Sequence, residues 1–142
     1  MRRALQFTTT QIAEGPSDMR IVLADREAEL MEVLWEYGPS TVSEVREKVR
    51  DELAYTTVLT VLRKLEAKGY VGHKEEGRAH RYLPLVARDA ARRSALRDLS
   101  LKLFKGSAEL LLTHLVSDQK LTDEEIRRIR RLLDEPARKD KS

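Results

Sequence analysis

Hydroxyl and cationic side chains recur at helical spacing in the stretch from residue 53 to residue 82. The polar side of one expected helix carries Thr56, Thr57, Thr60, Arg63 and Lys64. Hydroxyls and amides at a helix start bind phosphate, and a threonine also offers a methyl group for contact with thymine. A basic hairpin follows with Lys74, Arg78 and Arg81, which can reach the flanking backbone of a duplex. Taken singly, each residue is an ordinary surface group, but the whole arrangement predicts binding to double-stranded DNA.

Side chains suited to catalysis or metal binding are not arranged for either task. His73, His80 and His114 lack metal-ligand spacing, and the first two are expected as surface residues of the hairpin. The chain has no cysteine, which excludes disulfides and thiolate metal sites. It also lacks the glycine-rich and nucleophile motifs of nucleotide-binding and hydrolytic enzymes. We therefore predict a protein that is not an enzyme and that uses no metal or other cofactor.

Two helices are expected ahead of the polar helix. The first has Asp25 as its N-cap and ends at Gly38-Pro39, with an apolar stripe on one side and Glu27 on its outer side. The second begins at once, because the hydroxyl of Thr41 and the carboxylate of Glu44 can each satisfy a free amide at its start. We expect these two helices to form a scaffold against which the polar helix packs.

The polar helix itself is expected from residue 55 to residue 68. It ends at Gly69, which tolerates the positive φ of a C-terminal cap. Two β-like runs, 70–74 and 79–83, surround a glycine-containing loop and predict a hairpin. Three short helices followed by a hairpin are the layout of a winged helix-turn-helix. The predicted fold class is therefore mainly α, with a small β-hairpin wing and a helical C-terminal region.

Short amphipathic helices without a closed core of their own are expected after Pro84. They cover residues 87–104, residues 108–116 and a last segment that begins at the capping box of Thr122 and Glu125. Helices of this length seldom fold alone, so their apolar faces are expected to pair with a second copy of the chain. The residues predicted to form this homodimer are Leu96, Leu99, Leu103, Phe104, Leu111, Leu112, Leu115, Ile126, Ile129 and Leu133.

The 142-residue chain divides into four predicted parts. Residues 1–23 are an extension predicted to be flexible, 24–84 the winged helix-turn-helix domain, 85–135 the helical dimerisation region and 136–142 a polar tail. The net charge is only +3 at pH 7, so the placement of the cations matters more than their sum. No apolar run approaches the length needed to span a membrane and no secretory signal is recognisable, so we expect a cytoplasmic protein without membrane insertion.

A string of short motifs runs through the predicted DNA-binding domain. They are Glu29-x-Met31-x-Val33-Leu34-Trp35, Thr41-Val42-x-Glu44-Val45, Leu53-Ala54-Tyr55-Thr56-Thr57-Val58-x-Thr60-Val61-Leu62-x-x-Leu65, Lys68-Gly69-Tyr70-Val71 and Arg78-Ala79-His80-Arg81-Tyr82-x-Pro84. The string resembles that of the penicillinase repressor family (BlaI/MecI/CopY), closely over residues 25–84 and in helix order and spacing over 85–135. The resemblance implies a homodimeric winged-helix repressor that binds operators with dyad symmetry ahead of resistance or metal-homeostasis genes. It also implies that the polar helix faces the major groove and that Arg78 and Arg81 belong to the wing.

The resemblance further implies how such a repressor is removed from DNA. In the β-lactam branch of the family, a membrane sensor with a zinc protease domain triggers cleavage at an Asn-Phe pair in the dimerisation region. The corresponding place here is His114-Leu115, which departs from that pair. The copper-responsive branch uses a cysteine hook, which this cysteine-free chain lacks. The partners that the resemblance implies are operator DNA, a second copy of the chain and a membrane sensor protease.

Two alternative classes stay open at this point. A regulator of the MarR type would bind a small molecule in an aromatic-lined pocket beside the dimer helices, but Phe104 is the one aromatic residue after Tyr82. A winged helix can also serve protein binding alone, and a failure to shift any DNA at low salt would favour that class. The polar helix and the hairpin together favour the dimeric repressor.

Overall fold

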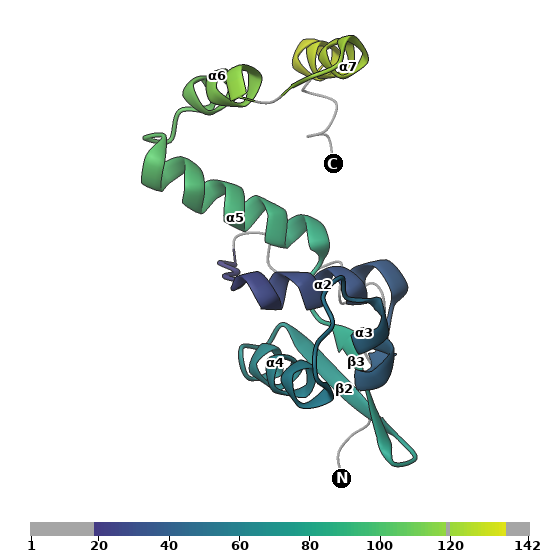
Figure 1. The fold of residues 1–142 in the computed structure, drawn as a ribbon. Helices are drawn as coiled ribbons and strands as arrows, with labels where there is room; N and C mark the ends of the chain where they lie inside the picture. The colour runs from purple at the N-terminus through teal and green to yellow at the C-terminus, as the bar shows by residue number, and fades with distance from the viewer. Residues whose placement is uncertain (1–18, 119, 136–142) are drawn as a thin grey trace. The chain divides into compact units, whose positions relative to one another are not determined.

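The computed structural model describes residues 19–118 and 120–135 (Figure 1). The elements in chain order are α2 (Asp25–Tyr37), β1 (Ser40–Thr41), α3 (Val42–Lys48), α4 (Tyr55–Ala67), β2 (Val71–Glu76), β3 (Ala79–Pro84), α5 (Arg88–Leu103), α6 (Ala108–Asp118) and α7 (Asp123–Asp134). The predicted class, mainly α with a small β-hairpin wing, is confirmed. Two units divide the chain, and the division falls within α5 between Arg97 and Asp98. Among the described residues, no helix is both long and apolar enough to cross a membrane.

Three helices enclose the apolar core of the N-terminal unit. Helix α4 packs against both α2 and α3. The fully buried side chains include Leu30, Met31 and Leu34 of α2 and Val58 and Leu62 of α4. Within each helix these residues are spaced three or four positions apart or are adjacent, so they form one apolar side. The other side of α4 is consequently left to solvent.

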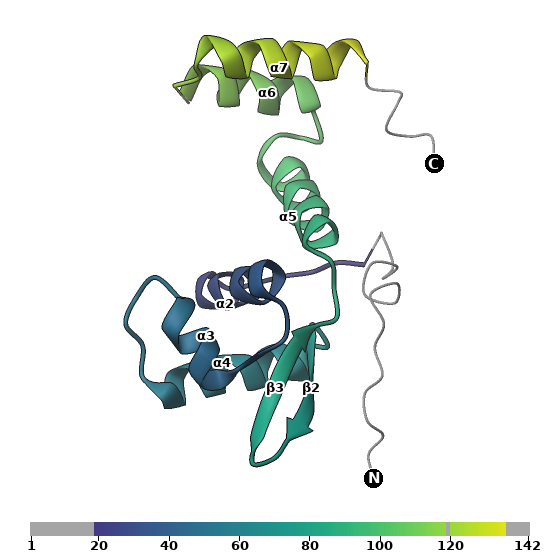
Figure 2. The ribbon, with the colours of Figure 1, turned by 90° about the vertical axis from the view of Figure 1, so that its right-hand side faces the viewer.

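A three-stranded antiparallel sheet of order β1-β3-β2 carries the wing. Figure 2 shows its two long strands, β2 and β3, side by side. Strands β2 and β3 are longer than predicted and leave a two-residue turn, in which Gly77 has a φ of 65° that suits glycine. No pattern in the sequence predicts β1, because two residues are too few to form one. Ser40 and Thr41 form this strand by antiparallel pairing with Tyr82 and Arg81 of β3.

The segment just ahead of α2 belongs to the core of the N-terminal unit. Ile21 is buried; its N–H donates to Ser94 Oγ over 2.7 Å, and Ser94 Oγ donates to the carbonyl of Ile21 over 3.3 Å. The N–H of Val22 donates to the hydroxyl of Tyr70 over 3.0 Å. Helix α5 adds two buried alanines to this core. The core thus extends beyond residues 24–84 on both sides, while the first eighteen residues of the predicted extension lie outside the described residues.

Local signals define the helices of the C-terminal unit. Lys105 and Gly106 have φ values of 53° and 72° and end α5. Ser107 caps α6 through its hydroxyl, which accepts a backbone N–H over 3.0 Å. The predicted capping box of α7 is confirmed: Thr122 Oγ1 accepts the N–H of Glu125 over 3.0 Å, and Glu125 Oε1 accepts the N–H of Thr122 over 2.9 Å. No residue that the structure describes in α6 or α7 is buried.

Candidate nucleic-acid interface

Helix α4 presents a polar face to solvent. All five residues predicted to line it are exposed: Thr56, Thr57, Thr60, Arg63 and Lys64. The opposite face, formed by Val58, Leu62 and Leu65, is fully buried. The core therefore holds the helix in place while its hydroxyls and cations stay available to a ligand. A helix that enters a DNA groove needs this division between its two faces.

The start of α4 lacks a side-chain cap. Ala54 is the N-cap residue and offers no acceptor to the amides of the first turn. Arg46 of α3 holds the chain ahead of the helix, because its Nε donates to the carbonyl of Leu53 over 2.7 Å. A helix start without a cap, next to Thr56 and Thr57, has the chemistry to bind a phosphate group.

A hollow of about 240 Å³ lies where α3, α4 and the wing meet. It brings together Arg63 of α4 and Arg78 of the wing turn. It also includes Ser43 and Tyr55, which are not among the predicted DNA-binding residues. Tyr55 is 46% exposed and directly precedes the threonine pair, a position that could have marked it in the sequence. No local pattern marks Ser43, which reaches the hollow only through the packing of α3.

The three cations predicted for the wing differ in their surroundings. Lys74 and Arg78 are exposed. Arg81 is instead bound within the protein, to the carboxylates of Glu44 and Glu76 and to a backbone carbonyl. Hydrogen bonding to Glu76 and the nearby carboxylate of Glu44 raise the pKa of Arg81. The structure therefore leaves Lys74 and Arg78 available to DNA and engages Arg81 elsewhere.

Two histidines join the wing to α4. His73 of β2 and His80 of β3 stack with ring centroids 4.4 Å apart, and His73 Nδ1 lies 2.7 Å from Glu66 Oε2 of α4. Tyr82 lies beside both rings; burial and the nearby Glu66 raise the pKa of its hydroxyl, against an opposing effect of Arg63. His80 is exposed as expected, but His73 is half-buried between the strand and the helix. Within the described residues, these groups do not form a three-ligand metal cluster.

A buried carboxylate links the start of α2 to the end of α4. Glu27 is 5% exposed, so the prediction that it lies on the outer side is wrong. Its Oε1 accepts hydrogen bonds from Lys68 Nζ over 2.6 Å and from the N–H of Ala24 over 2.8 Å. Burial raises the pKa of Glu27, but these hydrogen bonds outweigh burial and hold the pKa below its ordinary value. The predicted N-cap is also wrong: the helix begins at Asp25, and Glu27 satisfies the amide of the true cap residue, Ala24.

The family comparison agrees with this geometry. The profile of the penicillinase repressor family matches residues 23–135. The chain belongs to the penicillinase repressor family. The predicted resemblance is thereby confirmed, together with the class it implies: a DNA-binding transcriptional repressor with a winged helix, and not an enzyme.

Individual relatives show the same similarity. The transcriptional regulator BlaI of Mycobacterium tuberculosis is 40% identical over 98 residues, which cover 66% of this chain and 71% of that regulator. The penicillinase repressor of Bacillus licheniformis is 24% identical over 115 residues, which cover 80% of this chain and 90% of that repressor. A solution structure of the DNA-binding domain of the repressor BlaI covers 51% of this chain and 93% of its own, with 28% identity and a TM-score of 0.45.

The residues predicted for the homodimer are not buried within one chain. Those that are between 40% and 66% exposed are Leu96, Leu99, Leu103, Leu115 and Leu133. Those that are partly buried are Phe104, Leu111, Leu112, Ile126 and Ile129. Phe104 meets the ring of His114 edge-on, with centroids 5.4 Å apart. The C-terminal helices of the repressor therefore carry a large apolar surface that a single chain leaves in contact with water.

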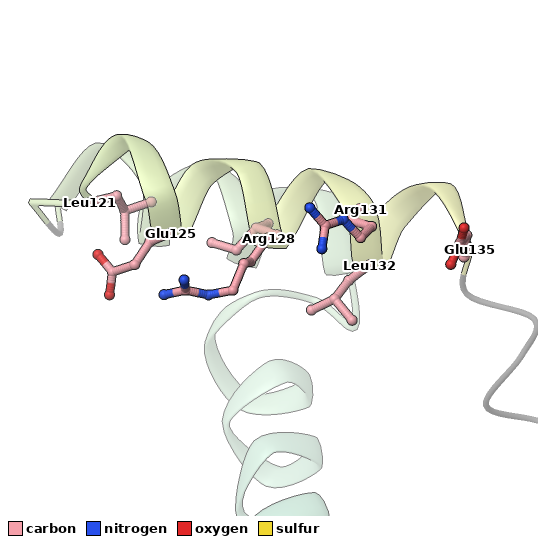
Figure 3. A pocket seen from close by; sticks show the side chains of 7 residues that line it. Leu121, Glu125, Arg128, Arg131, Leu132 and Glu135 are labelled. Carbon is pink, nitrogen blue, oxygen red and sulfur yellow. The ribbon is translucent and has the colours of Figure 1, made fainter.

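Figure 3 shows one side of α7. A hollow of about 660 Å³ is lined there by Leu121, Glu125, Arg128, Ile129, Arg131, Leu132 and Glu135. Leu121 and Leu132 point to the same side in this view, and Leu132 is 60% exposed. The helix thus combines an apolar stripe with charged residues at its border.

Proposed function

We propose that the chain is a dimeric repressor that occupies a dyad-symmetric operator in a promoter of antibiotic-resistance or stress genes. The observation that carries this proposal is the exposed polar face of α4 next to the hollow that Arg63 shares with Arg78. Threonine and arginine side chains there can bind base edges in the major groove. Lys74 and Arg78 can bind the flanking phosphates, which position the protein without reading sequence.

Two copies are needed, because one reading helix covers one half-site. The exposed leucines of α5, α6 and α7 support pairing with a second chain, since water contact with so much apolar surface is unfavourable. A two-fold axis in the dimer matches a two-fold axis in the operator, with half-sites a whole number of helical turns apart. Family membership favours this function over a ligand-controlled MarR-type regulator and over a winged helix that binds protein alone. A cytoplasmic location stays a prediction.

We also propose that cleavage at His114-Leu115 by a membrane sensor protease relieves repression. Both residues are exposed and lie in α6, among the residues proposed for the dimer. The bond is within a regular helix, so α6 must open locally before a protease can bind it. Mass spectrometry of the chain from cells exposed to a β-lactam tests this step. A fragment that ends at His114 supports it, and a chain that stays intact while the promoter becomes active refutes it.

The test of the main proposal begins with selection of bound sites from random DNA. Binding to the selected palindrome is then compared with binding to a scrambled fragment of the same length and composition. We expect tighter binding to the palindrome and an affinity that falls steeply with salt, because cations held at the phosphates are released on binding. Equal affinity for the two fragments would refute the repressor function.

A further inference from the structure

Arg81 occupies an unusual position among the cations of the wing, because three segments supply acceptors for it. Its Nη1 donates to the carbonyl of Pro39 over 3.2 Å and to Glu44 Oε1 over 3.0 Å. Its Nε donates to Glu76 Oε1 over 2.8 Å, and its Nη2 lies 2.8 Å from the same oxygen. The planar fork of an arginine can satisfy several acceptors at fixed angles, which a lysine cannot do.

The charge of Arg81 is therefore committed within the protein. One guanidinium faces two carboxylates, those of Glu44 and Glu76, and its side chain is 30% exposed. Among the described residues, neither Lys74 nor Arg78 forms an ion pair, and both are exposed. A phosphate at Arg81 would compete with two carboxylates for its charge, whereas no carboxylate in the described part of the chain competes for Lys74 or Arg78.

The bonds of Arg81 fix the wing against the helix-turn-helix. Arg81 lies opposite Thr41 of β1 and Lys74 of β2 in the sheet. Glu44 Oε1 accepts from Arg81 and also accepts the N–H of Thr41 over 3.0 Å. One carboxylate oxygen therefore binds both the start of α3 and strand β3 of the wing. Glu76, the last residue of β2, directly precedes the wing turn. Arg81 thus ties both strands of the wing to the segment that begins α3.

We propose that Arg81 is a positioning residue that holds the wing turn at the spacing from α4 that operator binding requires, and that Arg81 itself does not bind DNA. This inference rests on the proposed function, because it concerns how the same surface meets its operator. Arg78 in the wing turn and Arg63 on α4 line one hollow, so a change in the angle of the wing changes the distance between these two cations. Arg81 acts on DNA binding through Arg78.

Glu76→Gln tests this role, because positioning by Arg81 and simple electrostatics predict opposite changes in operator affinity. The substitution removes a negative charge from a hairpin that faces DNA, so electrostatics alone predicts tighter binding. We expect operator binding that is about three- to tenfold weaker. One exposed ion pair changes an equilibrium constant by about fivefold at most, and the proposed dimer carries this pair in each of its two wings. The matched control is Glu75→Gln, which makes the same charge change one residue earlier. In the described part of the chain Glu75 forms no ion pair, and we expect its variant to bind as well as the wild type or more tightly.

Arg81→Lys separates positioning from direct contact. A lysine binds phosphate well but cannot span the three acceptors, so we expect this variant to lose about as much operator affinity as Arg81→Gln. If the lysine variant instead binds like the wild type, Arg81 is a phosphate contact and the proposal is refuted. Adding Glu76→Gln to Arg81→Gln should cause little further loss, since both remove the same link.

All variants are measured on the selected palindrome and on the scrambled fragment, and thermal melting followed by circular dichroism reports whether each is folded. A wild-type protein without preference for the palindrome refutes the proposed function. A wild-type protein with that preference, together with equal affinities of Glu76→Gln and Glu75→Gln, refutes the role of Arg81 alone.

Discussion

The buried carboxylate of Glu27 allows a quantitative test of how α4, the helix proposed to read DNA, is held. Its two hydrogen bonds come from Lys68, at the C-terminal end of α4, and from the amide of Ala24. Replacement by alanine removes both and leaves the N–H of Ala24, the N-cap residue of α2, without its acceptor. A hydrogen bond to a charged group contributes about 1.5–3 kcal/mol, and a lost helix cap costs about 1 kcal/mol.

The contribution of Lys68 has to be discounted, because its side chain is 40% exposed and water replaces much of the lost interaction. We therefore expect Glu27→Ala to lower the free energy of unfolding by about 2–3 kcal/mol. Glu27→Gln keeps the shape and one acceptor oxygen, so we expect a loss of about 1–1.5 kcal/mol. The matched control is Glu29→Gln on the same helix. Glu29 pairs with Arg26 over 2.7 Å, but both side chains are about 40% exposed, and the expected loss is below about 0.5 kcal/mol.

Urea unfolding at several pH values is the assay, at one fixed protein concentration because the stability of the proposed dimer would depend on that concentration. The pKa of Glu27 in the folded chain is below its ordinary value of 4.5. The carboxylate therefore stabilises the folded state fully above that value, and this contribution is lost as the pH falls through the folded pKa. The difference between wild type and Glu27→Gln should be constant near neutral pH and shrink below about pH 4.5. A difference that does not change with pH would refute the role assigned to the charge.

Three further predictions concern α4, the core and the proposed dimer. Arg63→Ala should weaken operator binding by about 1–3 kcal/mol, while Arg131→Ala should not; equal losses in a gel-shift titration would contradict the assignment of α4. Ser94→Ala leaves the buried N–H of Ile21 without its acceptor and should lower the free energy of unfolding by about 1–3 kcal/mol, measured by urea titration. Leu103→Glu places a charge on a side chain that is 66% exposed in one chain, so it should leave the fold intact and favour monomers in analytical ultracentrifugation. An unchanged dimer would exclude Leu103 from the interface.

Much of this protein follows from the sequence because the deciding interactions are local. The capping box of Thr41 and Glu44 spans four residues, and both of its hydrogen bonds are present. Gly69 adopts the positive φ of 87° that the end of α4 requires. The apolar spacing in α4 divides the helix into a buried and an exposed side, so the sequence alone predicts that its threonines and cations are exposed. Such patterns lie within one or two helical turns, where residue type and spacing leave few alternatives.

The tertiary structure decided what depends on residues far apart in the chain. Glu27 has the spacing of a surface residue, but Lys68, 41 positions later, draws it into the interior. Arg81 looks like a DNA contact in the sequence, yet its acceptors on Pro39 and Glu44 lie 42 and 37 positions away. A charged side chain is available to a ligand only if no internal partner holds it, and the internal partner is set by how the strands and helices pack. The sequence therefore determined which helix is suited to read DNA, and only the packed structure showed which of the nearby charges remain to bind it.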